Sequence, residues 1–226
     1  MNRWIESRVR GRSFVDVGGL GGNAINEKVT VALDAGAASA TMIDIIPADH
    51  VFWQTFRAKC AAKGHLDVPC LVRDVLAADF GSVGQFDIVY NSGILYHVPD
   101  PIALLLQLRK IVRHTLIVTS CYVPERISNR AGTVEIPDGQ SLFIPTLAGR
   151  TRDVVAAHLE ELQVPVAGLC APAERFLLGD QVNYGPWWWL FTPSALRGLI
   201  GLCGFRTVDE GDCWDRRARA FVCELR

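Results

Sequence analysis

The chain has 226 residues, of which half are apolar and 21% are charged, and its net charge is −1. This length suits one α/β domain, and this composition supports a packed core and excludes general disorder. The near-neutral charge provides no broad electrostatic surface for nucleic acid, so such a partner is not expected, although a local basic patch stays open. The seven cysteines form no Cys-x-x-Cys pair and the five histidines are scattered, so we expect free thiols and no metal site.

The amino-terminal segment and the apolar runs bear on the location of the protein. Charged residues begin at Arg3 and no apolar signal core follows them, so we expect no secretion signal. The most apolar late run, residues 187–203, contains Pro193 and Arg197 and is too interrupted to span a membrane. Because free thiols persist in a reducing compartment, these features predict a cytoplasmic protein.

Residues 14–23, Phe-Val-Asp-Val-Gly-Gly-Leu-Gly-Gly-Asn, are the most informative stretch. A short apolar strand at 14–17 carries Asp16, four glycines follow within five positions, and a helix is expected over 24–35. A strand, a glycine turn and a helix are how open α/β sheets build a nucleotide pocket, because glycine lets the backbone approach a ligand closely. The helix N-terminus supplies spare N–H donors to the same crevice.

The rest of the chain alternates strands with helices. Further strands are expected at 40–45, 69–72, 86–90, 116–119, 205–208 and 220–225, and helices at 51–62, 101–111, 152–162 and 193–203. This alternation predicts a Rossmann-like, doubly wound and mostly parallel sheet in a single domain, 1–226. The proline-rich segment 122–190 breaks the pattern, and we expect it to be an insertion that covers a substrate above the carboxyl ends of the strands.

Three carboxylates follow successive predicted strands: Asp16, Asp44 and Asp74. In an open sheet the carboxyl ends of the strands line one crevice, so we expect these acids to face one ligand. A carboxylate at the end of the second strand can accept both hydroxyls of a ribose. Asp74 would then lie near an adenine amine.

Two nucleotide cofactors compete for this crevice. Residues 19–24 match the dinucleotide fingerprint G-x-G-x-x-A, and Asp44 lies 20 residues after Ala24, so an NAD-dependent oxidoreductase is one interpretation. Asp16 opposes it, because a carboxylate in the first strand end repels a pyrophosphate. The same carboxylate attracts S-adenosylmethionine, which carries an ammonium and a sulfonium and no phosphate. A non-catalytic module that keeps the fold for binding is a third interpretation.

From residue 14 to about 225 the chain resembles the class I S-adenosylmethionine-dependent methyltransferases. The segments that carry this resemblance are 14–22, 42–45 (Met-Ile-Asp-Ile), 73–76 (Arg-Asp-Val-Leu), 86–101, 189–196 and 203–205. Residues 92–101 are also similar to the wobble-uridine tRNA methyltransferase-like subgroup. The resemblance implies an antiparallel last strand, and a homodimer stays open.

The implied activity is transfer of a methyl group from S-adenosylmethionine to a hydroxyl or amine of a small molecule, such as a sugar or a natural-product intermediate. A tRNA-modifying enzyme is the alternative. The near-neutral charge and the 13 residues before the first strand favour the small acceptor.

Carried over to this sequence, the family's cofactor site consists of Asp16, Gly18, Gly19, Gly22, Asp44, Ile45, Asp74, Val75, Asn91 and Gly93. Asp16, Gly18 and Gly22 would shape the methionine end. Leu20 departs from the pattern, since the family usually has glycine there.

Side chains near the fourth strand and in the insertion are candidates for the acceptor site. His97 follows the fourth strand and is the candidate general base, because histidine titrates near neutral pH. The candidate acceptor residues are Tyr96, Tyr122, Arg126, Arg175, Tyr184, Trp187 and Trp188. Their aromatic rings suit a flat aromatic or sugar acceptor, and the arginines suit a carboxylate or phosphate on it.

Overall fold

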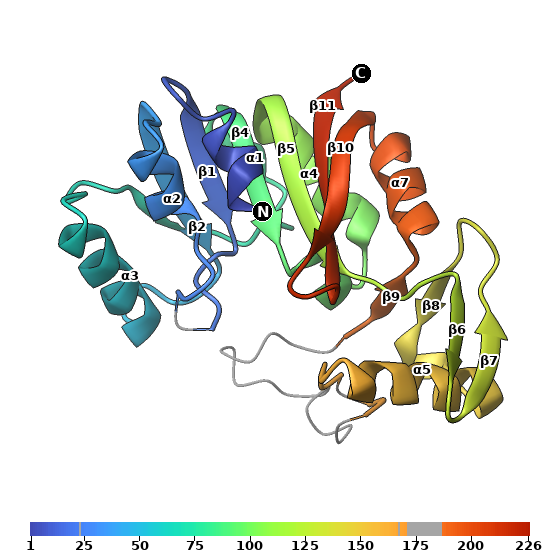
Figure 1. Ribbon diagram of the computed structural model, residues 1–226. Helices are drawn as coiled ribbons and strands as arrows, with labels where there is room; N and C mark the ends of the chain where they lie inside the picture. The colour runs from blue at the N-terminus through green and yellow to red at the C-terminus, as the bar shows by residue number, and fades with distance from the viewer. Residues whose placement is uncertain (23, 167, 171–186) are drawn as a thin grey trace.

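The computed structural model describes residues 1–22, 24–166, 168–170 and 187–226 (Figure 1). They form a seven-stranded sheet in the order β10-β11-β5-β4-β1-β2-β3. Its strands are β1 (Ser13–Val17), β2 (Ser39–Asp44), β3 (Cys70–Val72), β4 (Phe86–Ser92), β5 (Val112–Cys121), β10 (Phe205–Cys213) and β11 (Ala218–Leu225). The first five pair in parallel, and β11 runs antiparallel to both β5 and β10. The expected Rossmann-like sheet with an antiparallel last strand is confirmed.

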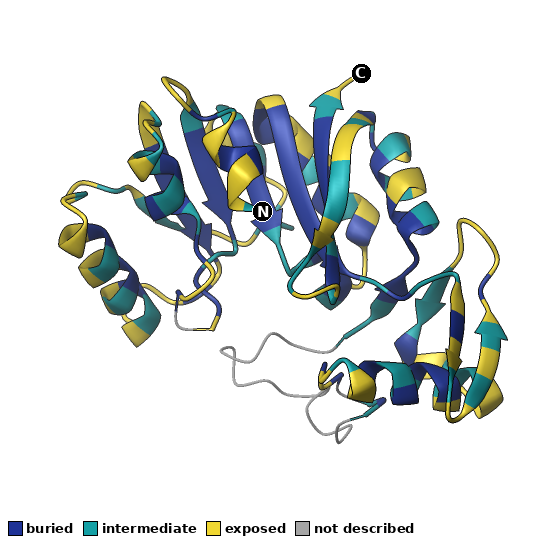
Figure 2. Ribbon diagram, viewed as in Figure 1, coloured by how far each residue is buried: buried dark blue, intermediate teal, exposed yellow. Residues whose placement is uncertain are grey.

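Helices cover both faces of this sheet. They are α1 (Asn2–Glu6), α2 (Val29–Asp34) and α3 (Val51–Ala62) on one face, and α4 (Pro101–Ile111) and α7 (Pro193–Leu202) on the other. Each face of the sheet has its own apolar core, and successive residues of a strand point to opposite faces. Phe14 packs in the core with α1, α2 and α3, and Val15 packs in the core with α4 and α7. Figure 2 shows the strands as a mostly buried layer between helices with exposed outer faces.

The helix starts follow from local capping chemistry. Asp100 precedes α4 and its side chain accepts a hydrogen bond from the Ala103 N–H, while Pro101 occupies the first turn. Thr192 caps α7 in the same way, accepting from Ala195 N–H. The predicted helix over 51–62 has the observed bounds of α3. The starts of α3, α4 and α7 could be predicted because the capping residue and the first turn of each helix lie within a few residues of each other.

The helix expected over 24–35 is wrong in its first turn. The observed α2 begins only at Val29, and Ala24 has a left-handed backbone with φ +57°. Ile25 is 73% exposed, whereas a helix over 24–35 would place it on the same face as the buried Val29. The glycine loop therefore extends through Lys28, whose N–H donates to the Asp16 carboxylate and fixes where the helix can start.

The insertion between β5 and α7 has regular structure of its own. It contains the hairpin β6 (Arg126–Asn129) and β7 (Gly132–Glu135), the pair β8 (Ser141–Phe143) and β9 (Trp189–Phe191), helix α5 (Gly149–Glu161) and the short 3-10 helix η3 (Ile144–Thr146). Val154, Val155 and Leu190 belong to a separate apolar cluster inside it. Figure 1 shows this smaller lobe beyond the carboxyl ends of the parallel strands. Only its helix was predicted, because strands of three or four residues are too short to show a period.

The structure also bears on the thiols and on membrane insertion. All seven cysteines are free thiols. Among the described residues, the structure contains no helix that combines the length and the apolarity needed to cross a bilayer.

Candidate active site

The parallel register brings three of the predicted residues to one edge of the sheet. β1 lies between β2 and β4, with Asp16 opposite Tyr90 and Val17 opposite Asn91. Asp44 is the last residue of β2. The carboxylates of Asp16 and Asp44 and the amide of Asn91 therefore sit at the carboxyl ends of adjacent strands, where open α/β sheets bind ligands.

Asp16 is a fully buried carboxylate at the first strand end. Its Oδ2 accepts a hydrogen bond of 2.7 Å from the Lys28 N–H. Its Oδ1 is buried and has no hydrogen-bond partner within the described part of the chain. Burial raises the pKa of Asp16 from 3.8 to about 8, because the ionised form has lost its water.

Glycine is required beside this carboxylate. A Cβ added at Gly19 would lie 2.4 Å from Asp16 Oδ2, so the loop backbone packs directly on the acid. Gly18 has φ +84°, and a Cβ there would come within 1.8 Å of Ile94 Cδ1. Gly22 is also left-handed, with φ +61°. The glycines predicted for the cofactor site thus allow close approach of the loop to Asp16 and to the chain after β4.

Asp44 is held by backbone donors on both oxygens. Oδ2 accepts from the Leu20 N–H at 3.0 Å and Oδ1 from the Ile46 N–H at 3.1 Å. Burial raises the pKa of Asp44, and these backbone hydrogen bonds oppose the shift. Each oxygen keeps capacity for a further donor. The next residue, Ile45, is 60% exposed, so an apolar side chain stands beside an oriented carboxylate.

Leu20 occupies the position where glycine was expected, and its side chain turns into the core. It is completely buried, in the cluster that contains Ala24, Trp53 and residues of α2. Only its backbone N–H reaches Asp44. The leucine therefore adds an apolar anchor under the loop and keeps the backbone donor that the site uses.

The end of β4 provides further polar groups at the same end of the sheet. Asn91 is buried, and its Nδ2 donates to the Val17 carbonyl at 3.0 Å. Its Oδ1 is buried and lacks a hydrogen-bond partner among the residues that the structure describes. Gly93 turns the chain away with φ +76°, and its N–H donates to the Thr119 carbonyl at 3.0 Å. Two orphaned acceptors, on Asp16 and Asn91, thus belong to adjacent strands.

Aromatic candidates gather just after this turn. Tyr96 lies in the 3-10 helix η2 (Leu95–His97) and stacks on Trp187 with ring centroids 4.0 Å apart and planes 19° apart. His97 is half-buried and 5.1 Å from the Trp187 ring in an edge-on arrangement. The Trp188 N–H donates to the Tyr96 carbonyl at 2.9 Å. The end of the insertion is therefore attached to the segment that follows β4.

The other predicted acceptor residues make contacts of different kinds. The Tyr122 hydroxyl donates to Asp212 at 3.3 Å. The exposed Arg126 pairs with Glu135 across the β6–β7 hairpin, and Figure 1 shows this hairpin on the far side of the insertion from β1 and β4. Trp188 stacks on Phe143 within the insertion, with centroids 6.1 Å apart. Arg175 and Tyr184 fall outside the described residues.

Residues 73–76, the segment expected beside the adenine, form a turn that is open to solvent. Asp74 is exposed, and its side chain accepts from the Leu76 N–H at 2.8 Å. Val75 is half-buried and packs against the core. The Arg73 N–H donates to the Asp44 carbonyl at 2.9 Å, which joins this turn to the end of β2.

Sequence reasoning missed three contributors to this crevice. Leu20 and Lys28 act through backbone N–H groups, which no side-chain motif shows. Trp214 belongs to the β10–β11 turn, and its ring lies 3.3 Å from where a Cβ on Gly93 would be. No local sequence pattern indicates it, because its place follows from the register in which Ala218 pairs with Cys121 and puts that turn at the carboxyl end of β5.

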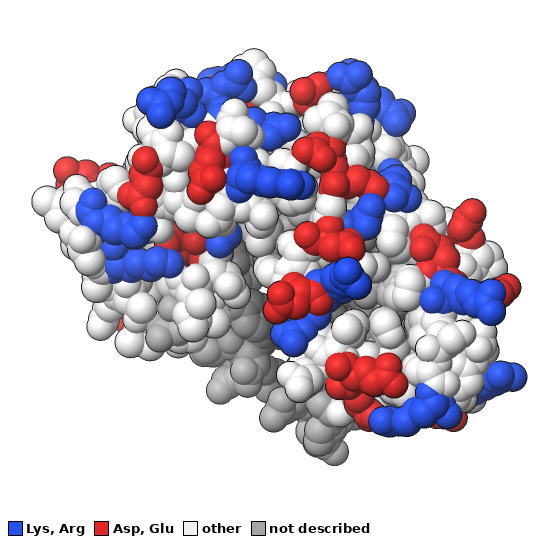
Figure 3. All heavy atoms as spheres, viewed as in Figure 1, with Lys and Arg blue, Asp and Glu red and all other residues white. Residues whose placement is uncertain are grey.

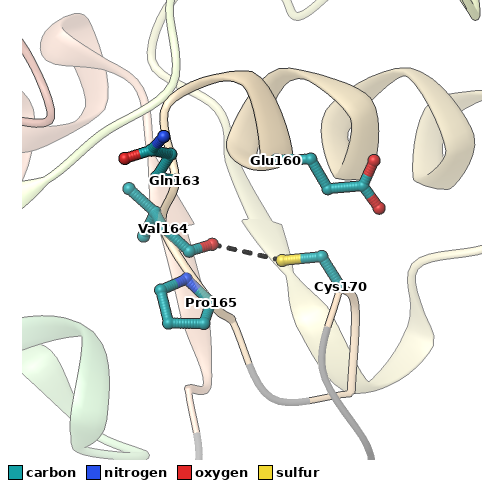
Figure 4. Close-up of a pocket in the computed structure, with 5 residues that line it drawn as sticks. All are labelled: Glu160, Gln163, Val164, Pro165 and Cys170. Carbon is teal, nitrogen blue, oxygen red and sulfur yellow. Dashed lines mark hydrogen bonds between the residues drawn. The ribbon is translucent and has the colours of Figure 1, made fainter.

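A separate hollow lies by the end of α5 and has a different chemistry (Figure 4). It is lined by Glu160, Gln163, Val164, Pro165 and Cys170. The Cys170 thiol donates to the Val164 carbonyl at 3.2 Å, so it serves the local fold. None of the strand-end residues lines this hollow.

Comparison with known proteins identifies the fold but no near relative. Neither a family model nor a curated protein matches the sequence. An O-methyltransferase family protein from Burkholderia thailandensis superimposes with a TM-score of 0.60 at 11% identity. The match covers 98% of this chain and 52% of that one, so this chain spans about half of its length.

Two further solved structures carry the cofactor or its product. The magnesium protoporphyrin IX methyltransferase of Synechocystis, with bound S-adenosylmethionine, has a TM-score of 0.55 at 13% identity over 100% of this chain and 76% of that one. A 1,6-didemethyltoxoflavin-N1-methyltransferase from Burkholderia thailandensis, with bound S-adenosylhomocysteine, has 0.56 at 14% identity over 99% and 77%. The sheet order, the glycine loop and these superpositions show that the chain has the fold of the S-adenosylmethionine-dependent methyltransferases.

Proposed function

We propose that this chain is an S-adenosylmethionine-dependent methyltransferase that methylates a hydroxyl or an amine of a small molecule. The observation that carries the proposal is the pair of buried acceptors, Asp16 Oδ1 and Asn91 Oδ1, without partners in the described residues. A buried carboxylate that lacks one of its donors matches a ligand with a cationic N–H group. The α-ammonium of S-adenosylmethionine is such a group.

Each part of the cofactor has a matching residue at the strand ends. Asp16 would accept from the ammonium, and Asp44, fixed by its two backbone donors, would accept the ribose hydroxyls. Ile45, with Val75, would pack on the adenine, and Asp74 would lie at the edge of that ring. The bound cofactor supplies an activated methyl on a sulfonium and leaves as a neutral thioether.

The glycine loop supports this cofactor over a dinucleotide. A pyrophosphate in a Rossmann site sits at the N-terminus of the helix that follows the glycines. Here the helix begins only at Val29, and Ala24, which completes the G-x-G-x-x-A match, is left-handed. The space beside Gly19 is taken by the Asp16 carboxyl group, which leaves the loop backbone there no room for a phosphate.

The surface supports a small acceptor over a nucleic acid. Figure 3 shows lysines and arginines interleaved with aspartates and glutamates on this face, without one uniformly basic region. A tRNA substrate would favour a continuous positive surface. One structural neighbour is named for the small molecule 1,6-didemethyltoxoflavin. The insertion at 122–190, attached to η2 through Trp188, would cover a small acceptor within the single domain.

His97 is the residue that we propose to receive the acceptor's proton. It follows β4 directly and stands beside Tyr96 and Trp187. When a hydroxyl attacks the methyl group, a carbon–oxygen bond forms, the carbon–sulfur bond breaks, and the hydroxyl proton must leave. An imidazole near this position can take that proton at neutral pH.

Calorimetric titration with S-adenosylmethionine, S-adenosylhomocysteine and NAD, each alone, tests the proposal. We expect micromolar binding of the first two and none of NAD. Binding of NAD alone would replace the methyltransferase with an oxidoreductase. Absence of binding for all three would leave a protein that keeps the fold without the activity.

A further inference from the structure

The turn between β10 and β11 has an unusual backbone. Trp214, Asp215 and Arg216 are consecutive non-glycine residues in the left-handed region, with φ of 50°, 52° and 66°. Such conformations persist only where the surrounding structure imposes them, and they gather at functional sites. The Arg217 N–H donates to the Trp214 carbonyl at 3.0 Å and closes the turn. Because Ala218 pairs with Cys121, the turn stands at the carboxyl end of β5.

This backbone directs the Trp214 ring to the end of β4. A Cβ added at Gly93 would lie 3.3 Å from the Trp214 ring and 3.4 Å from the Tyr96 hydroxyl. Tyr96 in turn stacks on Trp187. Trp214 and Tyr96 therefore meet beside Gly93, two residues after Asn91, and Trp187 extends this aromatic group through its stack on Tyr96.

The same turn carries a cation. Arg217 is half-buried and directly precedes Ala218, which pairs with Cys121 at the carboxyl end of β5. Burial raises the pKa of the Cys121 thiol to about 12, and the charge of Arg217 works against that shift. No carboxylate of the described residues comes within 4.0 Å of the Arg217 guanidinium, whereas Arg219, two residues later, pairs with Glu210 at 2.7 Å and Asp212 at 2.8 Å. Arg217 is thus a cation without an internal counter-ion in the described structure.

We propose that the β10–β11 turn completes the acceptor site and selects a planar aromatic acceptor that bears an anionic group. Trp214, packed beside Gly93, offers a ring face to the aromatic ring of the acceptor, and Arg217 binds the carboxylate or phosphate of the acceptor. This inference rests on the proposed methyltransferase function. Indole stacks well on flat rings, and a guanidinium pairs with oxyanions in bidentate geometry, so the two residues together distinguish such acceptors from neutral sugars.

The test uses two planar phenols of the same shape, para-coumarate and its neutral amide, para-coumaramide. Calorimetry is done on the full chain saturated with S-adenosylhomocysteine. The wild type should bind the carboxylate about tenfold more tightly than the amide. Trp214→Ala should weaken both ligands about tenfold, and Trp214→Phe should keep most of the affinity. Arg217→Gln should remove the preference for the carboxylate and leave the amide unchanged.

Matched measurements separate this inference from the proposed function. Arg216→Gln changes the exposed neighbour in the same turn and should alter neither ligand more than twofold, within the context dependence of a surface charge. S-adenosylhomocysteine should bind all variants as it binds the wild type. If the wild type fails to bind S-adenosylhomocysteine, the proposed function itself is wrong.

Three results would overturn the inference while the cofactor still binds. One is the absence of para-coumarate binding at millimolar concentration, and another is a Trp214→Ala variant with wild-type affinities. The third is an Arg217→Gln variant that keeps the preference for the carboxylate. This result would overturn the inference even if Trp214→Ala fails to fold.

Discussion

At the residue scale, Asp16 connects folding with ligand binding. Its carboxylate is completely buried, receives one hydrogen bond from Lys28, and leaves Oδ1 without a partner in the described residues. Burying a charge in this way costs stability, and an acid that is retained there is expected to serve a ligand. Asp16 therefore has opposite effects on the stability of the empty protein and on its affinity for a cationic cofactor.

Asp16→Asn should separate these two effects. Burial raises the pKa of Asp16 from 3.8 to about 8, so between these values the native state holds a proton that the unfolded chain has lost. The free energy of unfolding of the wild type should therefore fall as the pH rises from about 4 to about 8. The Asp16→Asn variant should lack this contribution to the pH dependence. Urea unfolding at several pH values measures it.

The same variant should bind S-adenosylhomocysteine at least about tenfold more weakly at high pH, because it loses a charge-assisted hydrogen bond to the ammonium. The ratio of the two affinities should grow as the pH rises through the pKa of Asp16. Asp87→Asn is the matched control, since Asp87 lies at the opposite end of the sheet and accepts from the Ser13 N–H. Equal loss of affinity in both variants would show that Asp16 acts only through stability.

A second prediction at the residue scale is that His97 affects the catalytic rate and not the binding of the cofactor product. His97→Asn should lower kcat by about a hundredfold or more with a hydroxyl acceptor, because the proton acceptor is lost. The affinity for S-adenosylhomocysteine should stay within about twofold. An unchanged kcat would remove His97 from the mechanism.

At the element scale, the glycine loop is constrained by contacts as well as by backbone angles. Gly18 and Gly64 have almost the same φ, +84° and +82°, but different surroundings. A Cβ at Gly18 would reach 1.8 Å from Ile94 Cδ1, whereas a Cβ at Gly64 would meet nothing within 4 Å. The two positions therefore separate left-handed strain from packing against the chain after β4.

Gly64→Ala should lower the free energy of unfolding by about 1 kcal/mol, through backbone strain alone. Gly18→Ala should cost a further ~1–3 kcal/mol, because Ile94 must move. Chemical denaturation of both variants gives the difference. If the two costs are equal, Ile94 moves aside freely, and its contact with the loop does not hold the site together.

At the scale of the whole molecule, two lobes meet at the proposed acceptor site. The sheet has a core on each face, and the insertion has a third core of its own. The lobes are joined where Tyr122 bridges to Phe191 and where the Trp188 N–H donates to the Tyr96 carbonyl. Tyr96, Trp187 and Trp214 reach the site from η2, the insertion and the last hairpin, so the acceptor surface depends on the tertiary arrangement.

The sequence alone determined the sheet, the strand-end acids and the glycine loop. Those signals are local: apolar runs, capping residues and glycines act over a few positions, so 14–17, 51–62 and the start of α4 could be predicted. Tertiary structure decided the rest. The burial of Asp16, the inward turn of Leu20 and the place of Trp214 beside Gly93 depend on strand register and on contacts between distant segments, which no local pattern encodes.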